Sequence, residues 1–108
     1  MSHDFDAQRA ETYAVFEDIQ AEADLPDIAD IDYAFTAGDS ADWDAAEAAL
    51  SEAGFECEPV EDDDGTPYLA ACLPDQPLTA MAIWLGEEAA TRLAMPHGFL
   101  PDGWGFSA

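Results

Sequence analysis

The chain closes with the segment Phe99-Leu100-Pro101-Asp102-Gly103-Trp104-Gly105-Phe106, which combines three large aromatic rings with two glycines and a proline. Asp102-Gly103 favours a turn with positive φ, so we expect the chain to bend there and to continue as a short extended strand. In that strand Trp104 and Phe106 point to one side, and Gly105 points to the other, where its missing side chain would admit a close neighbour. A strand this short is not stable alone, so the rest of the chain must supply a sheet. Alternatively, Asp102, Gly103 and Trp104 form a surface that a partner recognises.

Length and composition indicate a small folded protein. The 108 residues are enough for one hydrophobic core, so we expect a single domain over residues 1–108. Hydrophobic residues make up 49% of the chain, which argues against a disordered acidic tail. No apolar run approaches the ~20 residues that a bilayer requires. The first residues lack the basic and apolar regions of a secretory signal, so we expect a soluble cytoplasmic protein.

The net charge of −23 is the most unusual feature of the composition. Arg9 and Arg92 are the chain's two basic residues other than histidine, and it has no lysine. Nucleic-acid binding requires clustered lysine and arginine, so direct binding to RNA or DNA is excluded, whereas a basic protein surface would be attracted. The carboxylates are concentrated before residue 65, and only four follow. The alternative is that the acidity keeps the protein soluble in a salty cytoplasm and has no specific partner.

Hydrophobic periodicity predicts an N-terminal helix followed by a core over about residues 30–108. The expected elements are a helix over about 6–23, a strand over 31–36, a helix capped by Asp39 or Ser40 and stopped by Gly54, strands over 55–60 and 66–73, a helix over 78–95 and the closing strand over 104–107. Pro77 is expected in the first turn of the last helix.

The inward face of that last helix is assigned from its apolar spacing. The predicted stripe consists of Leu78, Ala82, Leu85, Ala89 and Leu93, with Met81 widening it. Ile83 and Trp84 fall outside this stripe. They either pack under the N-terminal helix or form an exposed apolar patch, in which case Trp84 is a candidate for binding a partner.

The predicted hairpin between residues 55 and 73 carries four consecutive carboxylates, Glu61-Asp62-Asp63-Asp64, beside Gly65. Asp62, Asp63 and Asp64 are candidates for binding a partner at this tip. A metal site there is disfavoured, because the spacing does not match a calcium loop. Cys57 and Cys72 lie on the two arms and are expected to be small core residues rather than a disulfide or zinc site. We therefore expect no metal or other cofactor.

Without the first helix, the order of elements is β-α-β-β-α-β. This is the order of the ferredoxin-like sandwich, an α+β fold in which a four-stranded antiparallel sheet carries two helices on one face. In that topology the closing strand lies beside the first strand, so Trp104 and Phe106 should pack near Tyr33 and Phe35. The other face of such a sheet is open and would allow a homodimer.

The segment from His97 to Gly105 resembles the end of the family of the regulator of ribonuclease E activity B. That family typically closes with a helix, a His-Gly or Gly-Gly stop and a Tyr-Asp-Gly-Trp strand start; here Pro101 stands where the tyrosine is common. Ala53-Gly54-Phe55 and the leading acidic helix also fit the family's order. The resemblance implies a ferredoxin-like, non-enzymatic protein that binds the scaffold part of ribonuclease E and lowers RNA decay. The chain departs from the founding type because it lacks the extended acidic tail.

These observations favour an acidic regulator that docks on a basic protein segment, with ribonuclease E as the partner that the resemblance implies. Two alternatives stay open at this point. One is an acidic inhibitor that mimics nucleic acid and has another target, and the other is a small metal-dependent enzyme that uses the carboxylates of the hairpin tip.

Overall fold

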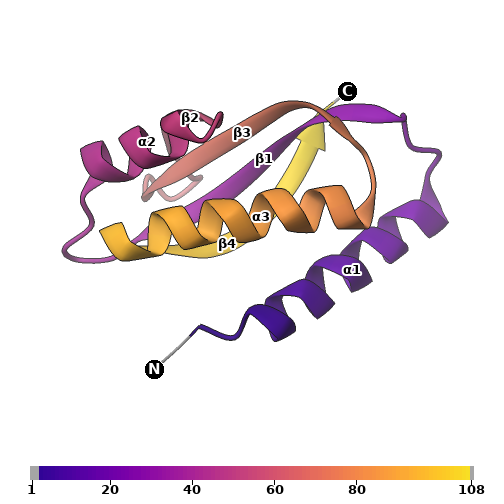
Figure 1. Cartoon of the computed structure of the whole chain (residues 1–108), viewed down its shortest axis with the longest axis horizontal. Helices are drawn as coiled ribbons and strands as arrows, with labels where there is room; N and C mark the ends of the chain where they lie inside the picture. Colours follow the sequence, from indigo (N-terminus) through magenta and orange to yellow (C-terminus); the bar gives the residue numbers. More distant parts are fainter. Residues whose placement is uncertain (1–2, 108) are drawn as a thin grey trace.

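The computed structural model describes residues 3–107, which form one antiparallel sheet and the helices that pack on it (Figure 1). The elements are α1 (Phe5–Glu22), β1 (Ile28–Ala37), α2 (Trp43–Glu52), β2 (Glu56–Glu61), β3 (Pro67–Pro77), α3 (Ala80–Ala94), the short 3₁₀ helix η1 (Met95–His97) and β4 (Phe99–Ser107). The strand order is β2-β3-β1-β4, with antiparallel pairing throughout. The predicted ferredoxin-like arrangement with an additional N-terminal helix is confirmed.

The core lies between the sheet and helices α2 and α3. Successive side chains of a strand point to opposite faces, and in β1 the residues Ile31, Tyr33 and Phe35 are fully buried while their neighbours Asp32 and Thr36 are exposed. The buried face packs in one cluster with α2 and α3. Helix α1 lies alongside α3 rather than over the centre of the sheet (Figure 1). None of the helices described for residues 3–107 covers the opposite face of the sheet.

Strand β4 is longer than predicted, because Asp102-Gly103 forms a β-bulge and not a turn. Tyr33 pairs with Trp104 and Phe35 pairs with Pro101, so Asp102 and Gly103 together lie opposite the single residue between them on β1. Gly103 has a φ of 110°, which a residue with a Cβ rarely adopts. The expected pairing of the closing strand with β1 is confirmed.

Gly105 does not admit a close neighbour, although its place in the strand predicted one. It points to the open face of the sheet, and a Cβ built on it would have no neighbour within 4 Å. The expectation of a close neighbour at Gly105 is therefore wrong.

A close contact of this kind occurs instead at Gly86, in the middle of α3. A Cβ built there would lie 2.3 Å from the hydroxyl oxygen of Tyr33. That hydroxyl donates a hydrogen bond to the backbone carbonyl of Ile83 at 2.9 Å. Gly86 therefore allows α3 to approach β1 closely enough for the buried tyrosine to find an acceptor on the helix.

Strand β3 continues four residues beyond the predicted end at Leu73. A bulge accommodates Pro74 and Asp75, and the Asp30 carboxylate accepts a hydrogen bond from the Asp75 backbone N–H at 3.0 Å. Pro77 consequently ends β3 and is not in the first turn of α3, which is capped by the Thr79 hydroxyl.

Helix α2 also begins later than predicted. Its N-cap is Asp42, whose side chain accepts from the Ala45 N–H at 3.1 Å, so neither Asp39 nor Ser40 is the cap. The reason lies in the backbone before the helix, where the Asp42 N–H donates to the His97 carbonyl at 2.8 Å and fixes Asp42 at the helix start.

The two cysteines are free and lie on opposite faces of the sheet, because Cys57 pairs with Ala71 and Cys72 pairs with Glu56. Cys57 packs against the core, as predicted. Cys72 faces the open side, so its assignment to the core is wrong. Partial burial raises the pKa of the Cys72 thiol to about 12, and a hydrogen bond with Asp32 and the nearby carboxylates of Asp30 and Glu56 contribute to this rise.

Candidate functional site

The structure separates the three groups of residues that the sequence singled out. The acidic tip joins β2 and β3 at one edge of the sheet, whereas Asp102, Gly103 and Trp104 lie on β4, the strand at the opposite edge. Trp84 is inside the molecule on α3. The candidates therefore do not form one continuous surface.

At the acidic tip, one of the carboxylates shapes the turn itself. The Asp62 side chain accepts hydrogen bonds from the backbone N–H groups of Asp64 and Thr66, both at 2.9 Å. Asp63, Asp64 and Gly65 form the loop between the paired backbone groups of Asp62 and Thr66. Within residues 3–107, no group of His, Cys, Asp and Glu side chains is arranged to hold a metal ion. The tip is an exposed acidic turn.

Helix α3 is rotated relative to the prediction. Trp84 is only 6% exposed and Ile83 is fully buried, so the exposed-patch alternative for these two residues is wrong. Met81 and Leu85 of the predicted inward stripe are instead 63% and 57% exposed. The inward face contains the polar residues Glu87 and Thr91, which an apolar stripe cannot identify.

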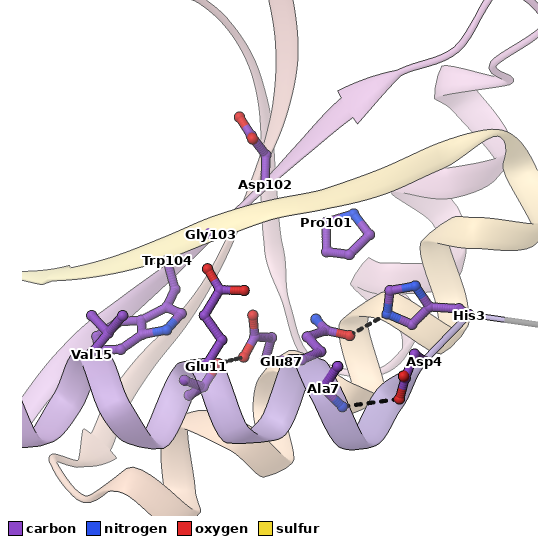
Figure 2. Close-up of a pocket in the computed structure, with 12 residues that line it drawn as sticks. His3, Asp4, Ala7, Glu11, Val15, Glu87, Pro101, Asp102, Gly103 and Trp104 are labelled. Atoms are coloured by element: carbon purple, nitrogen blue, oxygen red, sulfur yellow. Dashed lines mark hydrogen bonds between the residues drawn. The ribbon is translucent and has the colours of Figure 1, made fainter.

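A pocket lies between α1, α3 and β4, and we call it the α1–β4 pocket (Figure 2). Its volume is about 560 Å³. Its lining includes His3 just before α1, Gln8, Glu11 and Val15 of α1, Glu87 of α3, and Gly103 and Trp104 of β4. It thus includes part of the closing segment with which the sequence ends.

Figure 2 shows how the side chains of this pocket are directed. Glu11 rises from α1 toward β4, and the Trp104 ring lies beside it on the same side of the strand. Asp102 points away from α1, to the other side of β4. Of the predicted residues on β4, Trp104 therefore presents its side chain to the pocket, while Asp102 contributes through its backbone position in the bulge.

A polar network joins α1 to α3 at the base of the pocket. The Thr12 hydroxyl donates a hydrogen bond to Oε1 of Glu87, and the side-chain amide of Gln8 donates to the Thr91 hydroxyl at 3.2 Å. Thr12, Glu87 and Thr91 are each at least 96% buried. Since buried polar groups are costly without partners, these hydrogen bonds fix the position of α1 on α3.

Glu87 is the buried carboxylate of this network, with 4% of its surface exposed. Burial raises the pKa of Glu87 above its ordinary value, and the neighbouring Glu11 carboxylate adds to the rise. Contacts with Thr12 and Gln8 act in the opposite direction, because they stabilise the ionised form.

Both arginines lie outside the lining of the pocket. Arg92 forms an ion pair with Glu88 at 3.0 Å, and its guanidinium lies 4.1 Å from the centre of the Phe5 ring. Arg9 lies 5.2 Å from the centre of the Tyr13 ring, consistent with the expected packing on the helix surface. Since the chain has no lysine, neither a lysine nor an arginine among the described residues lines the pocket beside Glu11 and Glu87.

Sequence reasoning missed Glu87 and the role of α1. The spacing around Glu87 could have revealed its burial, because Glu87 lies three or four residues from Ile83, Trp84, Ala90 and Thr91, all of which are buried in the structure.

None of the described helices has an apolar stretch long enough to cross a bilayer.

Comparison with known proteins is consistent with this architecture. A family model described as "Regulator of ribonuclease activity B" matches residues 9–106, from the second turn of α1 to the end of β4 but one residue. A protein of Aeromonas salmonicida (strain A449) named "Regulator of ribonuclease activity B" is 32% identical over 110 residues, covering 97% of this chain and 96% of the relative. The shared region includes the pocket helix, the acidic hairpin and the closing strand. The chain therefore belongs to the family of the regulator of ribonuclease activity B.

Proposed function

We propose that this protein is a non-enzymatic cytoplasmic regulator that binds a basic segment of a ribonuclease and lowers RNA decay. Ribonuclease E is the partner we propose, in line with the resemblance of the closing segment. The observation that carries this proposal is the family match, which extends over residues 9–106. A relative with the same name as the family supports it, because that relative aligns with this chain over nearly its full length.

The charge supports a basic protein as the partner. A net charge of −23 on 108 residues repels polyanions such as RNA and attracts a basic polypeptide. Such attraction accelerates association and weakens when salt shortens the Debye length, which is about 10 Å at 0.1 M and about 3 Å at 1 M. The proposed complex should therefore form readily at low salt and weaken strongly at high salt.

Two exposed regions are proposed as contact surfaces. One is the acidic tip with Asp62, Asp63 and Asp64, and the other is the region around Asp102, Gly103 and Trp104 on β4. Because they lie at opposite edges of the sheet, one extended basic segment would have to cross the molecule to touch both. Trp84 is no longer included, since it is buried.

The proposal is tested by measuring cleavage of a defined RNA by purified ribonuclease E with increasing amounts of this protein. We expect slower cleavage at low salt and recovery of the rate at high salt, accompanied by loss of the complex in a pull-down. Poly-glutamate of matched total charge serves as the control for nonspecific acidity. Unchanged cleavage, or equal inhibition by poly-glutamate, would refute the proposal.

A further inference from the structure

We propose that the α1–β4 pocket binds an arginine side chain of the partner protein. This inference rests on the proposed function, because it assigns a docking point for the same basic partner.

The pocket has an aromatic wall and a carboxylate base. Trp104 lies on the side of β4 that faces α1, and Glu11 and Glu87 point into the same space from α1 and α3 (Figure 2). Thr12 donates to Oε1 of Glu87 and holds the carboxylate in place. A ligand in this space would meet the indole ring together with oxygen atoms that accept hydrogen bonds.

These groups match a guanidinium better than any other side-chain group. A guanidinium is flat, permanently charged and more weakly hydrated than an ammonium, so it can stack on an indole and donate to a carboxylate at the same time. Its paired N–H groups suit the two oxygens of a carboxylate. A lysine ammonium lacks the flat surface, and an anionic ligand would be repelled by Glu11 and Glu87.

Neither arginine of the chain enters this pocket, because Arg9 and Arg92 lie over the rings of Tyr13 and Phe5. Among the described lining residues, the His3 imidazole can carry a positive charge, and its Nε2 is hydrogen-bonded to Oε1 of Gln8. A guanidinium in the pocket would therefore belong to another molecule. A side chain of a partner is the source to which we commit, because the pocket lies between an edge strand and an outer helix, where an approaching polypeptide has access.

The first test titrates the full chain with N-acetyl-arginine amide and follows the indole N–H signal of Trp104 by NMR, assigned with the Trp104→Phe variant. We expect a saturable shift that the neutral analogue N-acetyl-citrulline amide does not produce. Equal shifts with both compounds, or no saturable shift, would overturn the inference. Tighter binding of free arginine than of the blocked amide would assign the pocket to a small molecule and would also overturn it.

The second test measures binding of ribonuclease E by variants that each remove one carboxylate. We expect Glu87→Gln to weaken binding about tenfold, as for a charge-assisted hydrogen bond, and the more exposed Glu11→Gln to weaken it about two- to fivefold. Glu52→Gln is the matched control, because Glu52 is exposed on α2, the helix that packs near β2 at the edge of the sheet opposite β4.

The two proposals can fail separately in this design. If ribonuclease E binds the wild type, and the Glu11 and Glu87 variants bind as tightly as Glu52→Gln, the arginine pocket is wrong while the proposed function stands. If ribonuclease E does not bind at all, the proposed function fails, and the titration with N-acetyl-arginine amide still decides whether the pocket accepts a guanidinium.

Discussion

Replacing Gly86 with alanine tests how closely α3 packs on the sheet. In an ordinary helix interior this change is stabilising by about 1 kcal/mol, since alanine is the better helix former. Here the added Cβ would lie 2.3 Å from the Tyr33 hydroxyl oxygen and 3.0 Å from the ring carbon that bears it. Both contacts are too short, so the ring or the helix must move. We therefore expect the sign of the effect to be reversed.

The magnitude follows from three contributions. Overpacking of a filled core costs about 1 to 3 kcal/mol. Displacing Tyr33 also removes its hydrogen bond to the Ile83 carbonyl, at a cost of about 1 kcal/mol. The gain in helix propensity offsets about 1 kcal/mol of this sum. The net loss is about 2 kcal/mol, which lowers Tm by about 8 to 16 °C in a domain of this size.

Urea and thermal unfolding of four proteins, the wild type, Gly86→Ala, Tyr33→Phe and the double variant, measure this effect. Tyr33→Phe removes the atom that makes the 2.3 Å contact, so Gly86→Ala should cost less in that background, by about 1 kcal/mol. Ala89→Gly, at an exposed position of the same helix, calibrates the propensity difference. If Gly86→Ala raises Tm as propensity alone would predict, the close packing of Tyr33 on α3 is refuted.

Three further comparisons test the corrected local structures and the buried carboxylate. Asp42→Ala should destabilise the protein by about 1 kcal/mol because it removes the cap of α2, whereas Asp39→Ala should change the unfolding free energy little; equal effects in urea unfolding would contradict the cap assignment. Gly103→Ala should cost about 1 to 3 kcal/mol because of its positive φ, while Gly105→Ala should be tolerated; a neutral Gly103→Ala in the same assay would argue against the bulge. Burial raises the pKa of Glu87 when the protein is folded, so the wild type should lose stability relative to Glu87→Gln as the pH rises from 4.5 through the folded-state pKa; a difference independent of pH would contradict the burial of this carboxylate.

The parts of the fold that could be predicted are those in which the buried side chains are apolar and the exposed ones are polar. The alternation of Ile31, Tyr33 and Phe35 with polar residues identified β1 and its inward face, and the structure confirms it. The pairing of β4 with β1 followed from the order of elements alone. In these segments, apolar side chains are inside and charged ones are outside, so periodicity is a sufficient guide.

The orientation of α3 could not be predicted by the same rule. Its inward face includes Glu87 and Thr91, whose hydrogen-bond partners Thr12 and Gln8 belong to α1, far away in the sequence. A polar residue that finds a partner only in the folded state looks like a surface residue in the sequence. The α1–β4 pocket was missed for this reason, since its base is Glu87.

The bulge in β4 makes the number of residues in the closing strand significant. Phe99, Pro101, Trp104 and Phe106 all lie on the helix side, at intervals of two, three and two, and the odd interval is possible because Asp102 and Gly103 share one position opposite β1. Deleting one of these two residues would shorten the odd interval to two, so a single residue would lie opposite Ala34 and both rings that follow would stay on the helix side. Deleting both residues would place Trp104 directly after Pro101 and would move both rings to the uncovered face. The closing strand can therefore lose one residue at this point, but not two, and still keep the indole next to the first helix.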